Sequence, residues 1–455
     1  MNNNGVNFGI SGNAQAYFQH SIDTSNLVNG KPVYYLIGQE NMIITPSTYP
    51  QIGFLALVDC VNIRVENLVL TDICNLQGIL LASTNNSTLA NNLVENNQEG
   101  IALYLSSDNT ISNNIATNSY VGVKLDSSSD NTVVGNTLKD NNLGIELSTT
   151  ASFSTNNTIF DNNIKTSDVG ISLNSGGNDV IHNTLANITS TGIAVGSDSS
   201  ENDISNNTVR SEAYGIYLGG LPAKRPISNT ISGNDIAING ATSARAGITL
   251  GYSDRNTISQ NTIVFLKSTY TTSQGIRIVS SLDNIIFNNT VANSGWRGAG
   301  ISLQAESSGN VIFHNDFVDN PTQAYSSEDS ISSWDNGYPS GGNYWSDYIG
   351  IDEKSGSKQD QTGSDGIGDT PYVIDERNRD RYPLMHPSSF TPWVLVTSPN
   401  GGEKWLVGSF QCICWADLGV SSNVSIDLSI DSGTTWEETL FANTVANGIK
   451  SWRVI

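Results

Sequence analysis

A short motif recurs along the chain at near-regular intervals, and it limits the fold more than any other feature. It consists of Gly, then Ile or Val, then any residue, then an aliphatic residue. Its glycines are Gly78, Gly100, Gly122, Gly144, Gly170, Gly192, Gly215, Gly247, Gly275 and Gly300. The first three intervals are 22 residues each, and later intervals lengthen to at most 32 residues. A fixed period of this length is typical of a solenoid in which every repeat forms one coil.

Each period contains three short alternating runs of apolar residues separated by polar turn residues. In one period these runs are residues 100–103, 110–112 and 114–116. Runs this short form strands that cannot bury a face alone, and the period has no room for a pair of helices. The sequence therefore predicts an all-β fold, a right-handed three-sided parallel β-helix with about 22 residues per coil.

Pairs of asparagines five residues apart accompany the glycine motif. They include Asn109 with Asn114, Asn131 with Asn136, Asn202 with Asn207, Asn229 with Asn234, and Asn256 with Asn261. Asn tolerates the positive φ that tight bends often need, and stacked Asn side chains can hydrogen-bond along a column. We therefore expect these residues to turn the chain between the sides of the helix and to form ladders, an architectural role.

Longer intervals between motif glycines predict loops that leave the stack, because a coil has no interior space for extra residues. These insertions are residues 221–227, 241–246 and 268–274. Insertions in solenoids often gather on a binding face. They are candidate ligand-binding loops, and tolerated surface insertions are an equally good interpretation.

Composition changes after the repeats and predicts three domains. Residues 1–332 are assigned to the β-helix. Residues 333–390 are rich in Trp, Tyr, Gly and Asp and are placed to cap its open end, which would otherwise expose apolar interior and strand edges. Residues 391–455 alternate in polarity as in a β-sandwich and end before such a domain would be complete.

Aromatic and acidic residues supply the candidate sites. The candidate ligand-binding residues are Tyr270, Trp296, Trp334, Tyr344 and Trp345. Asp365 and Asp369 flank a Gly-Ile-Gly turn and could bind calcium, the one cofactor considered, although the spacing does not match an EF-hand and a solvated acidic turn is the alternative.

The charge balance limits the choice of partners. The chain has 21 Lys and Arg, 43 Asp and Glu, and a net charge of −22, with only 14% of residues charged. Such a protein repels nucleic acid, and its neutral polar surface suits a polysaccharide or a cell-envelope glycan. The sequence has no apolar run long enough to span a membrane and no signal-peptide pattern at its start. We expect an extracellular or cell-surface protein whose export signal lies outside this chain.

Catalysis would require carboxylates from adjacent coils. Asp126 and Glu146 are the best pair, but Lys124 occupies the motif position equivalent to Glu146 one coil earlier, which favours a surface ion pair. We find no assembled catalytic motif. The preferred function is non-catalytic glycan binding or a structural role in the envelope; a polysaccharide lyase or glycoside hydrolase is the alternative.

The repeats, with residues 342–348 (GNYWSDY), 365–372 (DGIGDTPY) and 380–384 (DRYPL), resemble the NosD-like family of carbohydrate-binding and sugar-hydrolysis β-helix repeats, as found in archaeal cell-surface proteins. The resemblance covers most of residues 1–388. Residues 397–403 and 431–436 are similar to immunoglobulin-like or fibronectin-like modules of exported proteins.

The resemblance implies a second alternative function, that of a periplasmic accessory protein in copper-site maturation. The four histidines are His20, His182, His314 and His386. With three methionines they are scattered along the chain, without the cluster of soft ligands that copper prefers. The copper role is therefore not expected to carry over.

Overall fold

The computed structural model describes residues 6–71, 74–240, 245–266, 273–295, 297–387, 393–399, 403–418, 423–429, 438–445 and 448–454. The chain divides into two compact units, Met1–Ser388 and Ser389–Ile455. Tyr270 and Trp296 lie outside the described residues. Nothing in the described part of the chain could serve as a membrane-crossing helix.

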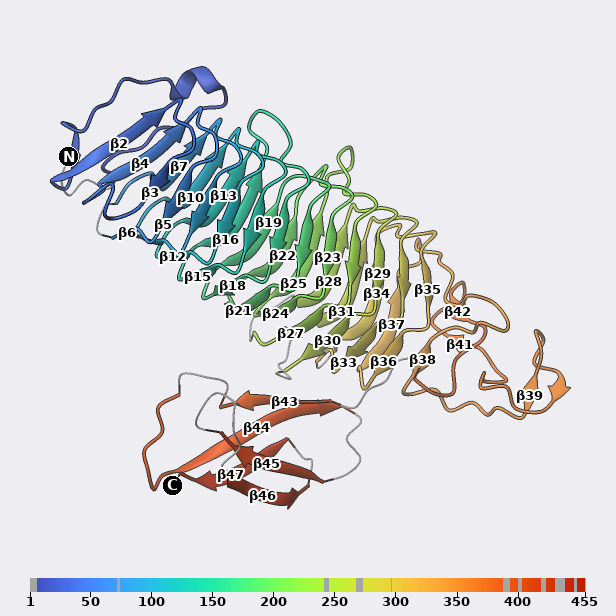
Figure 1. Cartoon of the computed structure of the whole chain (residues 1–455). Coiled ribbons are helices and arrows are strands. Elements are labelled where there is room, and N and C mark those ends of the chain that lie inside the picture. Colours follow the sequence, from blue (N-terminus) through green and yellow to red (C-terminus); the bar gives the residue numbers. More distant parts are fainter. Residues whose placement is uncertain are drawn as a thin grey trace. The chain divides into compact units, whose positions relative to one another are not determined.

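The first unit is a stack of three-sided coils whose strands form three long sheets (Figure 1). The first sheet consists of β1 (Leu27–Val28), β2 (Lys31–Ile37), β4 (Phe54–Val58), β7 (Gln77–Ala82), β10 (Glu99–Tyr104), β13 (Val121–Asp126), β16 (Leu143–Ser148), β19 (Val169–Leu173), β22 (Thr191–Val195), β25 (Tyr214–Gly219), β28 (Arg245–Gly251), β31 (Ser273–Val279), β34 (Ala299–Gln304) and β37 (Thr322–Ser326). The second consists of β3 (Ile43–Ile44), β5 (Arg64–Glu66), β8 (Thr88–Ala90), β11 (Thr110–Ser112), β14 (Thr132–Val134), β17 (Thr158–Phe160), β20 (Asp179–Ile181), β23 (Asp203–Ser205), β26 (Thr230–Ser232), β29 (Thr257–Ser259), β32 (Ile285–Phe287) and β35 (Val311–Phe313). The third consists of β6 (Val69–Leu70), β9 (Leu93–Glu95), β12 (Ile115–Thr117), β15 (Thr137–Lys139), β18 (Asn163–Lys165), β21 (Thr184–Ile188), β24 (Thr208–Ser211), β27 (Asp235–Ile238), β30 (Thr262–Phe265), β33 (Thr290–Ala292), β36 (Asp316–Val318) and β38 (Tyr344–Trp345).

Strands of consecutive coils pair in parallel and in register, so the predicted parallel β-helix is confirmed. Ile111 pairs with Val133 in the second sheet, and Ala116 pairs with Leu138 in the third. These four aliphatic side chains point inward and are completely buried. A single continuous core therefore runs through the stack, although each strand alone has only a few residues.

The motif glycine is required by close contact between coils. A Cβ built on Gly192 would lie 2.5 Å from the carbonyl oxygen of Gly215 in the next coil and 2.3 Å from Val209 Cγ1 in the core. The equivalent contact recurs from Gly100 to Gly300. Any side chain at this position would therefore push adjacent coils apart or displace a core residue.

The predicted asparagine ladders are present, and they bond coil to coil. Asn136 Oδ1 accepts hydrogen bonds from the backbone N of Asn114 (2.9 Å) and from its Nδ2 (3.0 Å). Asn136 Nδ2 donates to Ile111 O in the preceding coil (2.8 Å) and to Asn162 Oδ1 in the following coil (2.9 Å). Each ladder residue thus satisfies buried backbone groups that the short strands leave without partners.

The expectation that these asparagines themselves adopt positive φ is wrong. The left-handed residue is the one immediately before each ladder asparagine, for example Asn113 (φ 53°) before Asn114 and Gly135 (φ 65°) before Asn136. His182 and His314 hold the same position before Asn183 and Asn315. The preceding residue makes the bend, and the ladder asparagine can then direct its amide into the stack.

The outer face of the first sheet is covered near the N-terminus. The chain before β1 contains the 3₁₀ turn η1 (Gln15–Phe18), and Phe18 is completely buried with its ring 5.7 Å from that of Tyr104. The strands β4, β7 and β10 are consequently buried on both faces. Further along the stack the outer face of this sheet carries exposed and half-buried polar side chains.

The second unit is a small antiparallel β structure. β43 (Trp393–Ser398), β44 (Phe410–Leu418) and β47 (Ile449–Arg453) form one sheet, and β45 (Val424–Leu428) pairs with β46 (Glu438–Thr444). This arrangement agrees with the expected β-sandwich. Cys412 and Cys414 form a disulfide within β44, whereas Cys60 and Cys74 in the first unit are free.

The ladder gives a testable stability prediction. Asn136→Ala leaves the buried Asn114 N–H without an acceptor and should lower the free energy of unfolding by about 3 kcal/mol. The control Asn142→Ala removes an exposed asparagine and should change it by less than about 0.5 kcal/mol. Denaturant titration followed by circular dichroism measures both. Equal midpoints for the two variants would contradict a stabilising role for the ladder.

Candidate functional site

Two of the predicted ligand-binding residues are interior residues of the cap. Trp334 and Trp345 are 0% and 1% exposed. Trp345 is stacked between Phe317 (centroids 4.7 Å apart) and Tyr372 (4.4 Å). Their indole nitrogens donate inside the cap, Trp334 to Asn378 Oδ1 and Trp345 to Asp380 Oδ2. The ligand-binding prediction for these two residues is therefore wrong, because their rings close the end of the core and offer no surface to a ligand.

The other predicted cap residues have different surroundings. Tyr344 is half-buried, and burial raises the pKa of its phenol. Asp369 accepts backbone hydrogen bonds from Glu353 (3.2 Å) and Lys354 (3.0 Å). Asp365 accepts from Ile367 N (3.2 Å). These carboxylates hold turns of the cap together, and calcium binding at them stays a prediction.

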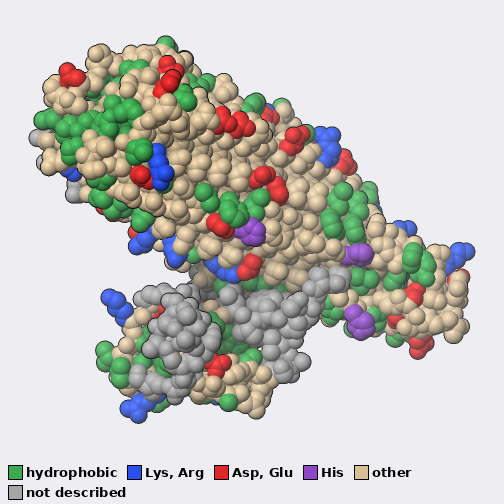
Figure 2. Space-filling model, in the orientation of Figure 1, with side chains coloured by type: hydrophobic (Ala, Val, Ile, Leu, Met, Phe, Trp, Pro, Cys, Tyr) green, Lys and Arg blue, Asp and Glu red, His purple; other side chains and the backbone are tan. Residues whose placement is uncertain are grey.

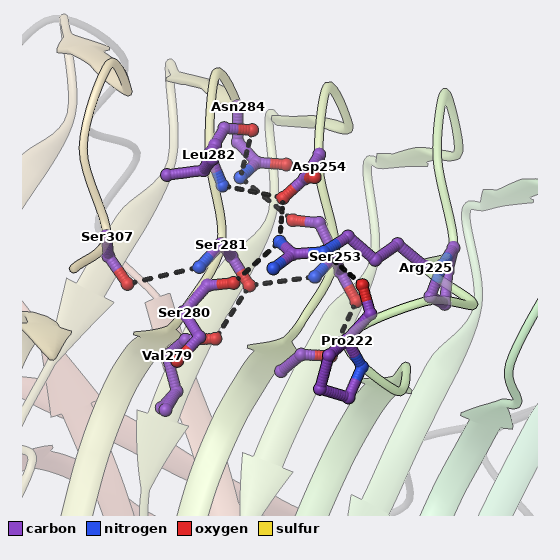
Figure 3. A network of polar contacts seen from close by, with 12 residues as sticks. Pro222, Arg225, Ser253, Asp254, Val279, Ser280, Ser281, Leu282, Asn284 and Ser307 are labelled. Atoms are coloured by element: carbon purple, nitrogen blue, oxygen red, sulfur yellow. Dashed lines mark hydrogen bonds and ion pairs between the residues drawn. The ribbon is translucent and has the colours of Figure 1, made fainter. Parts of the chain in front are cut away.

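The insertion at residues 221–227 is anchored to neighbouring coils by polar contacts of Arg225 (Figure 3). Arg225 Nη1 lies 2.8 Å from Asp254 Oδ1 and donates to Ser280 O (2.9 Å). Asp254 Oδ1 also accepts from Leu282 N (2.8 Å), and the guanidinium lies over the ring of Tyr252. The loop thus fastens neighbouring coils together, a role that explains its charged residues without a ligand.

A hollow of about 480 Å³ lies on the outer face of the first sheet near its C-terminal end. Its lining residues share polar or aromatic character: Gln274, Arg297, Ala299, Ser302, Gln304, Thr322, Tyr325 and Ser327. They come from β31, β34 and β37 and from the turn before β34. Amides, hydroxyls, guanidinium and an aromatic ring are the groups with which proteins hold sugars.

Strand register aligns the centre of this surface into one column. Tyr217 pairs with Thr249, Thr249 with Arg277, Arg277 with Ser302, and Ser302 with Tyr325. With about 4.8 Å between strands, the two tyrosines stand roughly 19 Å apart. Tyr325 is 49% exposed. The column therefore presents an aromatic ring at each end of a polar track that follows the axis of the helix.

Some hydrogen-bonding groups of the column are used by contacts within the protein, and others are not. Ser302 Oγ donates to Gln274 Oε1 (2.7 Å), and Arg277 Nη2 lies 3.5 Å from Gln304 Oε1. Thr249 is 2% exposed, and its Oγ1 has no hydrogen-bond partner among the described residues. Because this hydroxyl is buried, the groups of the column that a ligand can reach include instead the half-buried Arg277 and the exposed Tyr325.

A second polar cluster lies on the same face, close to the N-terminal cover. Glu99 accepts from Gln77 Nε2 (2.9 Å) and from Tyr104 Oη (2.8 Å). Lys124 Nζ lies 3.1 Å from Glu99 Oε1 and 3.7 Å from Glu146 Oε2. Glu99 thus has two hydrogen-bond donors and Lys124 as partners, whereas within the residues that the structure describes Glu146 has only Lys124 as its ion-pair partner.

The candidate catalytic residue Asp126 belongs to the same neighbourhood. Its carboxylate accepts from Thr150 N (3.0 Å) and Ser127 Oγ (3.0 Å). Burial raises the pKa of Glu146; Lys124 opposes this shift, and the charges of Glu99 and Asp126 add to it. The predicted ion pair of Lys124 with Glu146 is present, and it is partly buried within a larger network rather than isolated on the surface.

The hollow was not predicted from the sequence. Several of its members occupy the variable position of the glycine motif or flank it, for example Ser302 in Gly300-Ile-Ser-Leu and Gln274 directly before Gly275. Reading these outward positions one coil after another would have revealed the column. The irregular intervals there, which reach 32 residues, hide that alignment until the strands are in register.

The stacked three-sided coils and the polar outer face define a parallel β-helix protein. The family described as "Periplasmic copper-binding protein (NosD)" matches residues 6–194, 154–243 and 174–350, which together span more than half of the chain. This chain belongs to the NosD family. The expected family resemblance is therefore confirmed.

Several solved β-structures are similar at low identity. DFA-IIIase from Arthrobacter chlorophenolicus, solved in complex with GF2, has 12% identity, a TM-score of 0.44, and coverage of 55% of this chain and 69% of that chain. The tailspike protein of E. coli bacteriophage HK620, in complex with a pentasaccharide, has 12% identity, a TM-score of 0.42 and coverage of 63% of each chain. None of the curated proteins matches this chain. These likenesses do not transfer a function.

The residues of this chain do not fit the copper site that the family description implies. Among the described residues, no three His, Cys, Asp or Glu side chains gather to hold a metal. His314 Nε2 lies 2.6 Å from Ser340 O, and His182 packs edge-on against Phe160. Cys412 and Cys414 are joined to each other. We therefore assign no copper chemistry to this chain.

The buried cap carboxyl gives a pH prediction. Burial raises the pKa of Asp380 from 3.8 to about 7, although Asn343 N, Trp345 Nε1 and Tyr382 N donate to it. The unfolded carboxyl releases its proton near pH 4, so the stabilising contribution is complete below that pH and is lost as pH rises towards 7. The thermal unfolding midpoint should therefore decrease as the pH rises from about 4 to about 7. Asp380→Asn should flatten this trend, and the exposed control Asp360→Asn should preserve it.

Proposed function

We propose that this protein is an exported, non-catalytic β-helix that binds a glycan along the outer face of the first sheet. The observation that carries the proposal is the column from Tyr217 to Tyr325 with the hollow beside it. Its aromatic rings can stack on sugar faces, while Gln274, Gln304 and the hydroxyls supply directional hydrogen bonds. The periplasmic description of the family supports a location outside the cytoplasm.

The composition of the hollow favours binding over hydrolysis. Among its described lining residues there is no Asp or Glu. Glycoside hydrolysis commonly uses two carboxyl groups placed on either side of the scissile bond. A sugar in this hollow would meet amides, hydroxyls and guanidinium groups, which hold a ligand but do not act as a general acid and base near neutral pH.

The surface outside the hollow is suited to the same environment. Figure 2 shows that most of the visible surface of the helix consists of neutral polar side chains and backbone, with charged groups in small patches. Sparse charge leaves many hydroxyl and amide groups free to contact polysaccharide. This agrees with the preference for a neutral polar partner over nucleic acid that the charge balance predicts.

Removal of the exposed ring tests the proposal. For a glycan that binds the wild-type protein, Tyr325→Ala should lower the affinity about fivefold, since aromatic stacking contributes about 1 kcal/mol. Tyr120→Ala removes a ring that is 56% exposed at a distant coil and should leave affinity unchanged. Affinity electrophoresis against a panel of polysaccharides measures both variants. Equal retention of wild type and Tyr325→Ala on every binding polymer would exclude this site.

A glycoside hydrolase centred on Glu146 is the second candidate function. The specific observation is a carboxyl whose pKa is raised by burial and by the neighbouring Glu99 and Asp126. A protonated carboxyl beside an ionised one is the usual arrangement of a general acid and its partner in these enzymes. Against it, Lys124 lies between Glu99 and Glu146, and Glu99 already accepts from Gln77 and Tyr104.

Product analysis separates the two functions. For a binding protein, chain lengths of every polysaccharide in the panel should stay constant during incubation with the wild-type chain. For a hydrolase, some polymer should shorten, and Glu146→Gln should slow that reaction at least about 100-fold by removal of the acid. The control Glu353→Gln changes an exposed cap residue and should retain full activity in that case. Shortening that Glu146→Gln leaves unchanged would exclude this cluster.

A further inference from the structure

We propose that the hollow on β31, β34 and β37 selects a glycan that carries negatively charged groups, either carboxylates or sulfate esters. This inference rests on the proposed function, since it specifies the ligand of the same site. At this site, the inferred ligand is an acidic glycan and not a neutral one.

The central observation is the pair of guanidinium groups. Arg297 lines the hollow, and Arg277 stands beside it on β31, paired with the lining residue Ser302 of β34. Within the described part of the chain, Arg277 takes part in no ion pair, and its one hydrogen bond goes to the neutral amide of Gln304 at 3.5 Å. A guanidinium has five N–H donors arranged for bidentate contact with a carboxylate or a sulfate-like anion. Most donors of Arg277 therefore stay available to a ligand.

The contrast with the other described cations of the first unit makes this arrangement informative. Arg64, Lys124, Arg210, Arg225 and Arg381 each lie within 3.1 Å of an Asp or Glu oxygen. Arg277 instead lies half-buried beside neutral amides and hydroxyls, and its place next to the hollow points to an anionic ligand.

The net charge of −22 does not prevent this contact. At physiological ionic strength, charges are screened over about 8 Å, so the groups beside the ligand dominate. The nearby acids along the chain, Glu306 and Glu328, are exposed in the turns that follow β34 and β37 and do not line the hollow. Distant acids would instead discourage an anionic polymer from binding elsewhere on the surface.

Amides and hydroxyls complete the site for a sugar. The lining of the hollow supplies amides from Gln274 and Gln304 and hydroxyls from Thr322 and Ser327. Tyr325 can stack on the ring while Arg277 binds a substituent. The combination recognises a charged sugar unit better than a free inorganic anion, because the ring and the hydroxyls contribute only with a saccharide.

The test compares polymers that differ only in charge. Polygalacturonate is paired with its fully methyl-esterified form, and dextran sulfate with dextran, using the full chain and measuring dissociation constants by affinity electrophoresis. We expect the charged member of at least one pair to bind at least about tenfold tighter. The pair that shows the preference identifies carboxylate or sulfate as the recognised group.

Matched variants assign the preference to the hollow. The double variant Arg277→Gln/Arg297→Gln should reduce affinity for the charged polymer to that of its neutral partner and leave affinity for the neutral partner unchanged. Arg64→Gln removes an arginine of the second sheet and should have no effect. The thermal unfolding midpoint checks that both variants are folded, and the comparison of polymers on the wild-type chain does not depend on either variant.

Two results would overturn the inference. Equal affinity of the wild-type chain for the charged and neutral members of both pairs would exclude anion selection, while the proposed glycan binding would still stand. Lack of retention by every polymer, neutral ones included, would refute the proposed function together with the inference. A charge preference that survives in the Arg277→Gln/Arg297→Gln double variant would place the anion site elsewhere and overturn the assignment to this hollow.

Discussion

Hydrogen bonds between equivalent residues of successive coils are the constraint on which the rest of the structure depends. Each strand is too short to be stable alone, so stability comes from repetition along the stack. The asparagine ladders supply bonds at the bends, where the β pairing stops and backbone groups would otherwise lack partners. The glycine column has a complementary role, because its contact with the next coil's carbonyl oxygen sets how closely coils approach.

This repetition restricts the residue types allowed at the inner and bend positions, but not those at the outer positions. Inward positions must be aliphatic, ladder positions must offer an amide, and the motif glycine accepts no side chain. Outward positions of the first sheet face no such requirement. They align in columns, in which successive residues are about 4.8 Å apart. The column from Tyr217 to Tyr325 is a product of that freedom, with side chains from separate coils brought into one surface.

The two ends of the stack require a different solution, because a last coil has no neighbour to cover its core. At the C-terminal end Trp345 stacks on Phe317 and covers the core, whereas Phe18 near the N-terminus covers the outer face of the first sheet. The cap places a buried carboxyl, Asp380, among three N–H donors. Closure of the ends thus uses aromatic residues that a sequence alone equally well assigns to ligand binding.

The sequence by itself determined the parallel β-helix, the coil length and the asparagine ladders, because these depend on residue types repeated at a fixed interval. It misplaced the bend residue by one position, since φ depends on backbone geometry that neighbouring Asn, Asp and Gly residues all tolerate. The tertiary structure alone decided that Trp334 is interior while Tyr325 is exposed. It also decided which outward residues meet, because Gln274, Arg277 and Tyr325 become neighbours only through strand register across unequal insertions.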